Sequence, residues 1–280
     1  MRLITANKIK DTVADLCIQA NLLLRNDVLA QLKSAYKREK HKRAKGILEA
    51  IIRNAALARR NKLAICQDTG FPCVLIELGQ DLKIKGDLNR AINQGVEEGY
   101  KKGYLRNSIV KDSLFRRKSG YQPAVINIDM VKGDRLRITV LPKGFGCENR
   151  TQLKMFKPTA QLDEIKEFII DTVKQAGPDA CPPYIVGVGI GGTADYACLL
   201  AKKALLKKVT RQEPRAKSYI AKVEKDLLQE LNRLNIGPMG LGGETTCLGV
   251  NILTYPTHIA GLPVAVNISC HALRSATAIL

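Results

Sequence analysis

The feature that most constrains the fold is a change of apolar pattern near residue 60. Before it, apolar side chains recur every three or four residues, as in ILEAIIRNAALA, while Gly and Pro are nearly absent, which predicts helices. After Leu63, short apolar runs alternate with amphipathic stretches. The pattern predicts a mixed α/β (α+β) chain, one domain over residues 1–280 with 1–60 mainly helical, followed by mixed β-sheets flanked by helices.

Two kinds of strand signal stand out after residue 60. The run Pro72–Gly79 is short and mainly apolar and predicts a buried strand. Residues 124–141 alternate apolar and polar side chains on both sides of Lys132–Asp134, which predicts a β-hairpin with its turn there. Further helices are expected at 85–102, 160–176, 194–208 and 216–234, and further strands at 184–190 and in CLGVNILT and LPVAVNISC.

The chain is strongly basic, with 45 Lys and Arg against 26 Asp and Glu and a formal charge of +19. The densest basic run, Lys37–Arg43, lacks interleaved aromatic residues and any nucleic-acid-binding motif, so we interpret it as a solvated helix junction. An acidic partner subunit or an anionic substrate explains the charge without nucleic acid. A basic nucleic-acid-binding protein remains a remote alternative. Neither a signal peptide nor a membrane-length apolar run is present, so we expect a cytoplasmic protein without a membrane partner.

Eight cysteines lie far apart in the sequence, without a CxxC pair. In a reducing compartment each is core filler or a ligand. Cys66, Cys181 and Cys270 each stand at the edge of an apolar run, beside turn-forming or polar residues. Three such thiolates could hold an iron–sulfur cluster with one iron open to substrate, but separations of 115 and 89 residues match no compact ligand motif, so ordinary burial remains open. Packing is the expectation for Cys73, Cys198 and Cys247.

A glycine motif, Gly187-x-Gly189-x-x-Gly192, lies between a predicted strand and a predicted helix. It matches a dinucleotide-binding fingerprint, which also requires a second strand ending in an acidic residue about 20 positions on. Glu213 stands at a suitable distance but ends no predicted strand. An NAD-binding oxidoreductase is therefore a remote alternative, and close packing of helix on strand is the other interpretation.

Four stretches together resemble a known family. They are AICQDTG at 64–70, LPKGFGCENRTQLKMFKP at 141–158, ACPPYIVGVGIGGTADYACLLAKKAL at 180–205, and IGPMGLGGETTCLGVNILTYPTHIAGLPVAVNISCHALR at 236–274. In this order they resemble the amino-terminal domain, or α subunit, of the class I fumarate hydratase and L(+)-tartrate dehydratase family. The resemblance covers about residues 60–275.

The resemblance implies a 4Fe-4S cluster held by Cys66, Cys181 and Cys270, whose open iron acts as a Lewis acid on the substrate hydroxyl. It also implies that five residues bind the dicarboxylate substrate: Gln67, Asp68, Arg106, Gly146 and His258. Asp68 and His258 match residues that handle or orient protons. The implied reaction is the reversible hydration of fumarate to (S)-malate, favoured by the segments TYPTHIAGLPVAVNISCHA and GGETT, with dehydration of L(+)-tartrate as the alternative.

The same resemblance implies a partner. The sequence continues for ten residues after Cys270, where single-chain members of the family continue into a second domain. This chain therefore resembles the separate α subunit of an oxygen-sensitive enzyme. It would require a β subunit, which supplies further substrate contacts and the general base, in an α2β2-type hetero-oligomer. One departure from the family pattern is the loop with Phe145 and Cys147, where further glycine or serine is usual.

Overall fold

The computed structural model describes residues 2–209 and 218–280 and divides into two compact units. Unit 1 comprises Met1–Leu24, Ala55–Phe145 and Arg274–Leu280, and unit 2 comprises Arg25–Asn54 and Gly146–Leu273. Each unit combines helices with a four-stranded sheet, which confirms the predicted mixed α/β class. The expectation of a single domain over residues 1–280 stays a prediction.

The first 60 residues are helical, as their periodicity predicts. The helices are α1 (Ala6–Leu22), α2 (Asn26–Arg38) and α3 (Lys42–Asn61), preceded by the short strand β1 (Arg2–Thr5). Helix α1 begins where the Thr5 hydroxyl accepts the backbone N–H of Lys8 at 3.3 Å, an N-cap that satisfies a donor the helix leaves unpaired. Its buried side chains, Ile9, Val13 and Leu16, recur at intervals of four and three.

Unit 1 is built on a sheet with the strand order β12 (Ala276–Ile279), β7 (Leu136–Lys143), β2 (Phe71–Gly79) and β6 (Val125–Val131). The core of the unit joins α1 and α4 (Leu88–Lys102) to apolar side chains of β2 and β7, among them Val74, Ile76 and Ile138. Strand β1 pairs in parallel with β3 (Leu82–Lys85).

The predicted hairpin at 124–141 is wrong, although both of its strands exist. β6 and β7 do not pair with each other, because β2 lies between them, parallel to β6 and antiparallel to β7. The turn at Lys132–Asp134 instead wraps around the end of β2, where the backbone N–H of Asp81 donates to the carbonyl of Gly133 at 3.0 Å. Alternation identifies a strand but not its neighbour, and the mainly apolar β2, with Cys73, Val74 and Ile76 buried, is most stable as a central strand.

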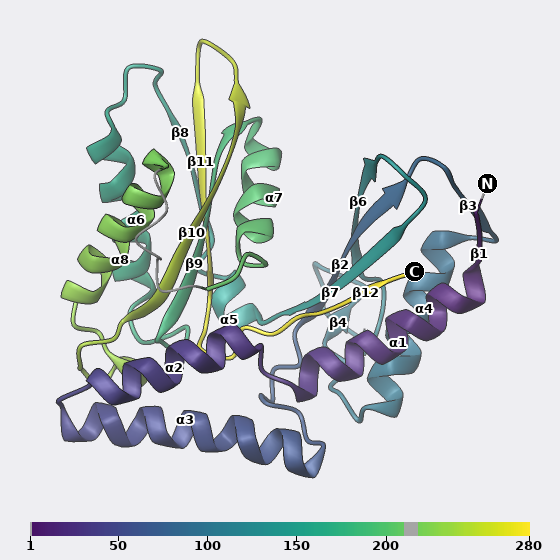
Figure 1. Ribbon diagram of the computed structural model, residues 1–280, viewed down its shortest axis with the longest axis horizontal. Coiled ribbons are helices and arrows are strands. Elements are labelled where there is room, and N and C mark those ends of the chain that lie inside the picture. Colours follow the sequence, from purple (N-terminus) through teal and green to yellow (C-terminus); the bar gives the residue numbers. More distant parts are fainter. Residues whose placement is uncertain (1, 210–217) are drawn as a thin grey trace. The chain divides into compact units, whose positions relative to one another are not determined.

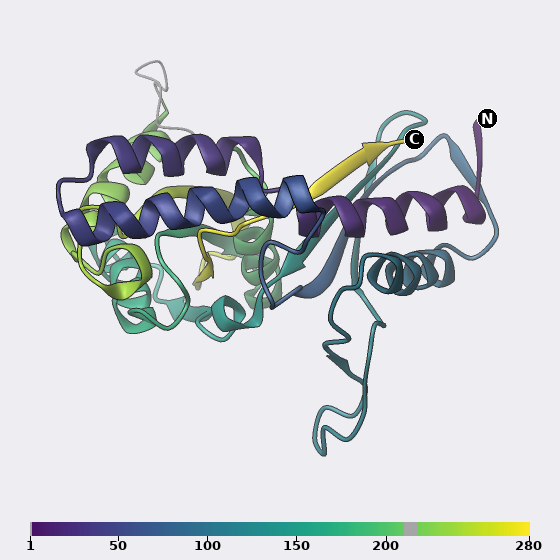
Figure 2. The same ribbon diagram turned by 90° about the horizontal axis from the view of Figure 1, so that it is seen from below.

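Between α4 and β6 the chain forms an arm that includes the short antiparallel pair β4 (Ile109–Val110) and β5 (Ser119–Gly120) (Figure 2). Leu114 and Phe115 lie between these strands and are largely exposed. The arm begins at the loop that carries Arg106.

Unit 2 is built on a sheet with the order β10 (Cys247–Thr257), β9 (Tyr184–Gly192), β11 (Leu262–Ser269) and β8 (Gln152–Phe156). β9 and β10 are parallel, and β11 is antiparallel to both β9 and β8. Helices α6 (Leu162–Ala176) and α8 (Tyr219–Arg233) cover one face and α7 (Ala194–Ala204) the other (Figure 1). The short elements are α5 (Phe145–Glu148) and the 3-10 helix η1 (Pro238–Gly240).

The glycine motif serves the packing of α7 on β9. A Cβ at Gly187 would lie 2.2 Å from the carbonyl oxygen of Ala201, and one at Gly189 would lie 2.1 Å from that of Ala197. No side chain fits there, so these two glycines are required by the close approach of helix and strand, as the packing interpretation predicts. Glu213, the acidic residue of the NAD alternative, lies outside the described residues.

Candidate functional site

Burial divides the cysteines into two groups. All eight are thiols within the described residues. Cys66, Cys181 and Cys270 are partly exposed, together with Cys198, and the other four are buried. Burial raises the pKa of Cys17 and of Cys247 to about 12, so both stay protonated at neutral pH and are poor metal ligands. The three predicted ligands are thus among the accessible thiols, and the expected packing of Cys73 and Cys247 is confirmed.

In unit 1 the segment Cys66–Gly70 is held by the carboxylate of Asp68. One carboxylate oxygen accepts the backbone N–H of Gly70 at 2.9 Å, and the other accepts that of Phe145 at 2.8 Å. The same segment places Cys66 and Gln67 side by side, with the Cys66 thiol donating to the Gln67 side-chain oxygen at 3.3 Å. Asp68 is therefore a clamp between the segment that bears Cys66 and the loop at residue 145.

Three buried groups fix the backbone of this segment. The Tyr100 hydroxyl donates to the carbonyl of Thr69 at 2.8 Å. The Arg274 guanidinium, which is only 3% exposed, donates to the carbonyl of Asp68 and, at 3.3 Å, to the side chain of Asn21. Gly70 has a φ of +76°, and a Cβ there would lie 2.6 Å from Pro142, so only glycine fits.

Arg106 is tied to this segment through its backbone. Its N–H donates to the Thr69 hydroxyl at 3.1 Å, and that hydroxyl donates back to the Arg106 carbonyl at 3.4 Å. The Arg106 side chain is exposed. Unit 1 therefore brings together four predicted site residues: Cys66, Gln67, Asp68 and Arg106.

In unit 2 the structure brings together Gly146, Cys181 and Cys270. The Cys181 carbonyl lies 3.0 Å from Nδ1 of His271, the residue that directly follows Cys270. The Cys147 thiol donates to the carbonyl of Ala180 at 3.3 Å, which holds the loop with Gly146 against the residues before Cys181. Cys181 has a φ of +57°, a conformation that is uncommon outside glycine and is often retained at functional sites.

His258 lies away from these residues within the same unit. It follows the end of β10, in the turn that leads into β11, whereas Cys270 follows the other end of β11. The eight residues of β11 therefore separate the two, a rise of roughly 26 Å at about 3.3 Å per residue. The His258 ring accepts the backbone N–H of Ala260 at its Nδ1, at 3.1 Å, and the side chain is exposed.

Sequence reasoning missed two residues that shape the site. Arg274 orders the segment of Cys66, and its position four residues after Cys270 was the only signal. Glu148 holds α5 in place by accepting hydrogen bonds from Lys202 and Asn267. The available signal in the sequence was a charged residue in the glycine-containing loop GFGCENR.

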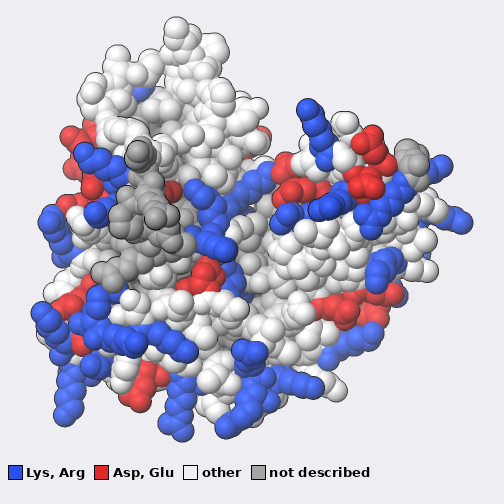
Figure 3. Space-filling view, viewed as in Figure 1, with Lys and Arg blue, Asp and Glu red and all other residues white. Residues whose placement is uncertain are grey.

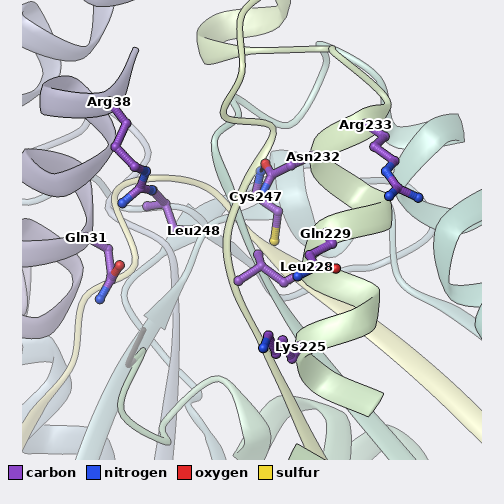
Figure 4. Close-up of a pocket in the computed structure, with 9 residues that line it drawn as sticks. All are labelled: Gln31, Arg38, Lys225, Leu228, Gln229, Asn232, Arg233, Cys247 and Leu248. Atoms are coloured by element: carbon purple, nitrogen blue, oxygen red, sulfur yellow. Dashed lines mark hydrogen bonds between the residues drawn. The ribbon is translucent and has the colours of Figure 1, made fainter. Parts of the chain in front are cut away.

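A separate cavity of about 580 Å³ lies in unit 2 between α2 and α8 (Figure 4). None of the predicted site residues lines it. Arg233, which is drawn on the far side of α8 from Cys247, forms an ion pair with Glu230 at 2.6 Å. The lining residues are Gln31, Arg38, Lys225, Leu228, Gln229, Asn232, Arg233, Cys247 and Leu248.

The basic run Lys37–Arg43 forms the junction of α2 and α3, as predicted, and Figure 3 shows Lys and Arg side chains crowded along this part of the molecule. Glu39 is buried within the run and accepts the backbone N–H of Glu244 at 2.9 Å. Among the described helices, none is long and apolar enough to cross a membrane.

Chemically, the described residues offer soft thiol donors in both units, an exposed guanidinium, and a glycine loop. Thiolates suit iron–sulfur clusters, and a guanidinium suits a carboxylate. No three His, Cys, Asp or Glu side chains among the described residues form a ready-made metal-binding group. Two of the predicted ligands belong to unit 2 and the third to unit 1.

Comparison with known proteins gives a consistent result. The model of the fumarate hydratase (Fumerase) family matches residues 10–279. A protein of Methanocaldococcus jannaschii named "Putative L(+)-tartrate dehydratase subunit alpha" is 40% identical over 276 residues, covering 96% of each chain. The L(+)-tartrate dehydratase subunit alpha of Escherichia coli K12 is 30% identical over 275 residues, covering 97% of this chain and 90% of that protein.

Proposed function

The chain belongs to the fumarate hydratase family of hydro-lyases, and we propose that it is the cluster-bearing α subunit of an enzyme that hydrates or dehydrates a four-carbon dicarboxylate. The observation that carries this proposal is the environment of Cys66, Cys181 and Cys270. All three are partly exposed, and each lies within a segment ordered by hydrogen bonds beside other predicted site residues.

The donor set fits a 4Fe-4S cluster. A cluster with one open iron requires three accessible thiols, and Cys66, Cys181 and Cys270 are three of the four that are partly exposed, Cys198 being the fourth. The buried Cys17 and Cys247 are disqualified by their raised pKa. When bound, such a cluster supplies a Lewis acid for the departing hydroxide. The residues that would hold it are Cys66, Cys181 and Cys270.

The chain's own residues would bind and orient the substrate. The exposed Arg106 guanidinium pairs with one substrate carboxylate, while Gln67 and the backbone of Gly146 donate hydrogen bonds to oxygen atoms of the substrate. Both Asp68 oxygens are engaged by backbone N–H groups, so we propose that Asp68 mainly orients Cys66 and Gln67. A proton-handling role for His258 requires substrate at the turn between β10 and β11, and His258→Gln would then lower turnover without loss of iron.

The substrate and the partner are proposals at a finer level. The segments TYPTHIAGLPVAVNISCHA and GGETT favour fumarate as the substrate, while the names of the relatives favour L(+)-tartrate. Both substrates are four-carbon dicarboxylates, and Arg106 and the cluster would bind either one. The name "subunit alpha" carried by the relatives supports a β subunit as partner, for which we propose an α2β2-type assembly.

The test is an anaerobic purification of the chain together with the proposed β subunit, followed by iron and sulfide analysis and by assays with fumarate and with L(+)-tartrate. Serine at Cys66, Cys181 or Cys270 is expected to abolish the cluster and the activity. Serine at Cys198, the fourth accessible cysteine, is the matched control and should retain both. A full cluster in any of the three ligand variants would refute the ligand assignment. Turnover of tartrate alone would keep the mechanism and change the substrate.

A further inference from the structure

Helix α5 ends in a cluster of polar side chains that the proposed reaction does not use. One carboxylate oxygen of Glu148 accepts from Nζ of Lys202 at 2.6 Å. The other accepts from the side-chain amide nitrogen of Asn267 at 3.0 Å, and that nitrogen also donates to the Thr151 hydroxyl at 2.9 Å. The Glu148 side chain is 22% exposed and that of Lys202 is 20% exposed, so the pair is largely withdrawn from water.

The cluster joins three elements that carry proposed site residues or support them. Glu148 stands two residues after Gly146. Asn267 lies in β11, three residues before Cys270, and pairs with Gly187 in β9. Lys202 is in the last turn of α7, which packs on the same sheet. Glu148 thus links the loop of Gly146 directly to the strand that leads to Cys270, and the Thr151 hydroxyl makes a second such link.

The charge of Glu148 determines how Asn267 is oriented. Asn267 is 1% exposed, and its side-chain oxygen is buried without a hydrogen-bond partner among the described residues. The reversed amide would place that oxygen against the carboxylate of Glu148, which is repulsive. A carboxylate only accepts hydrogen bonds, so it can serve Lys202 and Asn267 together, whereas a glutamine must turn its NH2 group toward one of these two donors.

We propose that Glu148 is a positioning residue that fixes the backbone of Gly146 relative to the strand of Cys270, and thereby sets the affinity for the substrate. The inference rests on the proposed function for the roles of Gly146 and Cys270. Glu148 itself touches neither substrate nor cluster in this proposal.

A second set of contacts keeps the fold intact when Glu148 is changed. On the other side of the loop, the Arg150 guanidinium pairs with Asp179 at 2.6 Å, and the Cys147 thiol binds the carbonyl of Ala180. These contacts tie the loop to the residues before Cys181 and do not involve Glu148. Glu148→Gln should therefore loosen the loop without unfolding unit 2.

The test compares Glu148→Gln with Glu230→Gln, a matched control that breaks an equally short ion pair, to Arg233, on the exposed surface of α8. In the chain without cluster, amide hydrogen exchange of the peptide 144–151 should accelerate about tenfold in Glu148→Gln, as expected when a local hydrogen-bonded anchor opens. In the holoenzyme, KM should rise about tenfold with kcat changed less than about twofold, because uniform substrate binding is lost rather than the chemical step.

Removal of the second donor gives a rescue. In Glu148→Gln/Lys202→Met the glutamine can turn its oxygen to Asn267 with no donor opposite its NH2 group, so both exchange and KM should return most of the way to wild type. Unchanged exchange and KM in Glu148→Gln, a fall of kcat at constant KM, or a double variant worse than the single one would each overturn the proposal. If the wild type turns over neither substrate, the proposed function has failed, and hydrogen exchange still decides whether Glu148 holds the loop.

Discussion

The carboxylate of Asp68 offers the sharpest test of how the site is built. Asp68→Ala removes both acceptors, for the N–H groups of Gly70 and Phe145. Because Asp68 is half-buried, we assign each hydrogen bond about 1.5 kcal/mol, the lower end of the range for charged groups. The free energy of unfolding of the alanine variant should therefore fall by about 3 kcal/mol. Asp68→Asn keeps one acceptor and should lose about 1.5 kcal/mol.

The assay is thermal and urea unfolding of the chain, with Asp112→Asn as the matched control. Asp112 also accepts two backbone N–H groups, of Leu114 and Phe115, but in the exposed arm, so its loss should cost well under about 1 kcal/mol. The expected fall in Tm is about 3–6 °C for Asp68→Asn. If Asp68→Asn had wild-type stability but lost activity by about 100-fold or more, the orienting role of Asp68 would be refuted. Asp68 would then act in the chemical step.

Two further predictions concern packing and pH. Gly189→Ala should destabilise the chain by about 2–3 kcal/mol, because its Cβ would lie 2.1 Å from the carbonyl of Ala197. A Cβ at Gly46 in α3 meets nothing within 4 Å, so Gly46→Ala should stabilise the chain by about 0.5–1 kcal/mol. Urea unfolding measures both free energies, and equal effects of the two substitutions would contradict the packing argument. Burial raises the pKa of Cys17 and Cys247 to about 12, whereas the unfolded chain ionises them near about 9. The folded state then holds more protons, so the free energy of unfolding should fall as pH rises from about 9 to 12, by up to ~1.4 kcal/mol per thiol and pH unit. Anaerobic urea titrations at several pH values should show a shallower slope in Cys17→Ala/Cys247→Ala, and identical slopes would exclude these thiols as the cause.

The sequence by itself predicted the types of most elements and named the residues of the candidate site. Helical periodicity predicted that residues 1–60 are mainly helical, and the apolar runs located β2, β9, β10 and β11, because both signals are local in the chain. The family motifs selected Cys66, Cys181 and Cys270, and the structure shows these three thiols to be accessible.

Only the tertiary structure decided which segments meet. Strand β2 separates β6 from β7, because a mainly apolar strand is most stable with a neighbour on each edge. The local alternation in β6 and β7 cannot reveal this. The tertiary structure alone also shows that the backbone of Arg106 bonds Thr69 and that Glu148 bonds Asn267. It likewise places His258 and Cys270 at opposite ends of β11. These contacts join residues far apart in the sequence, and their partners are chosen by burial and hydrogen-bond satisfaction across the whole unit, which no local pattern encodes.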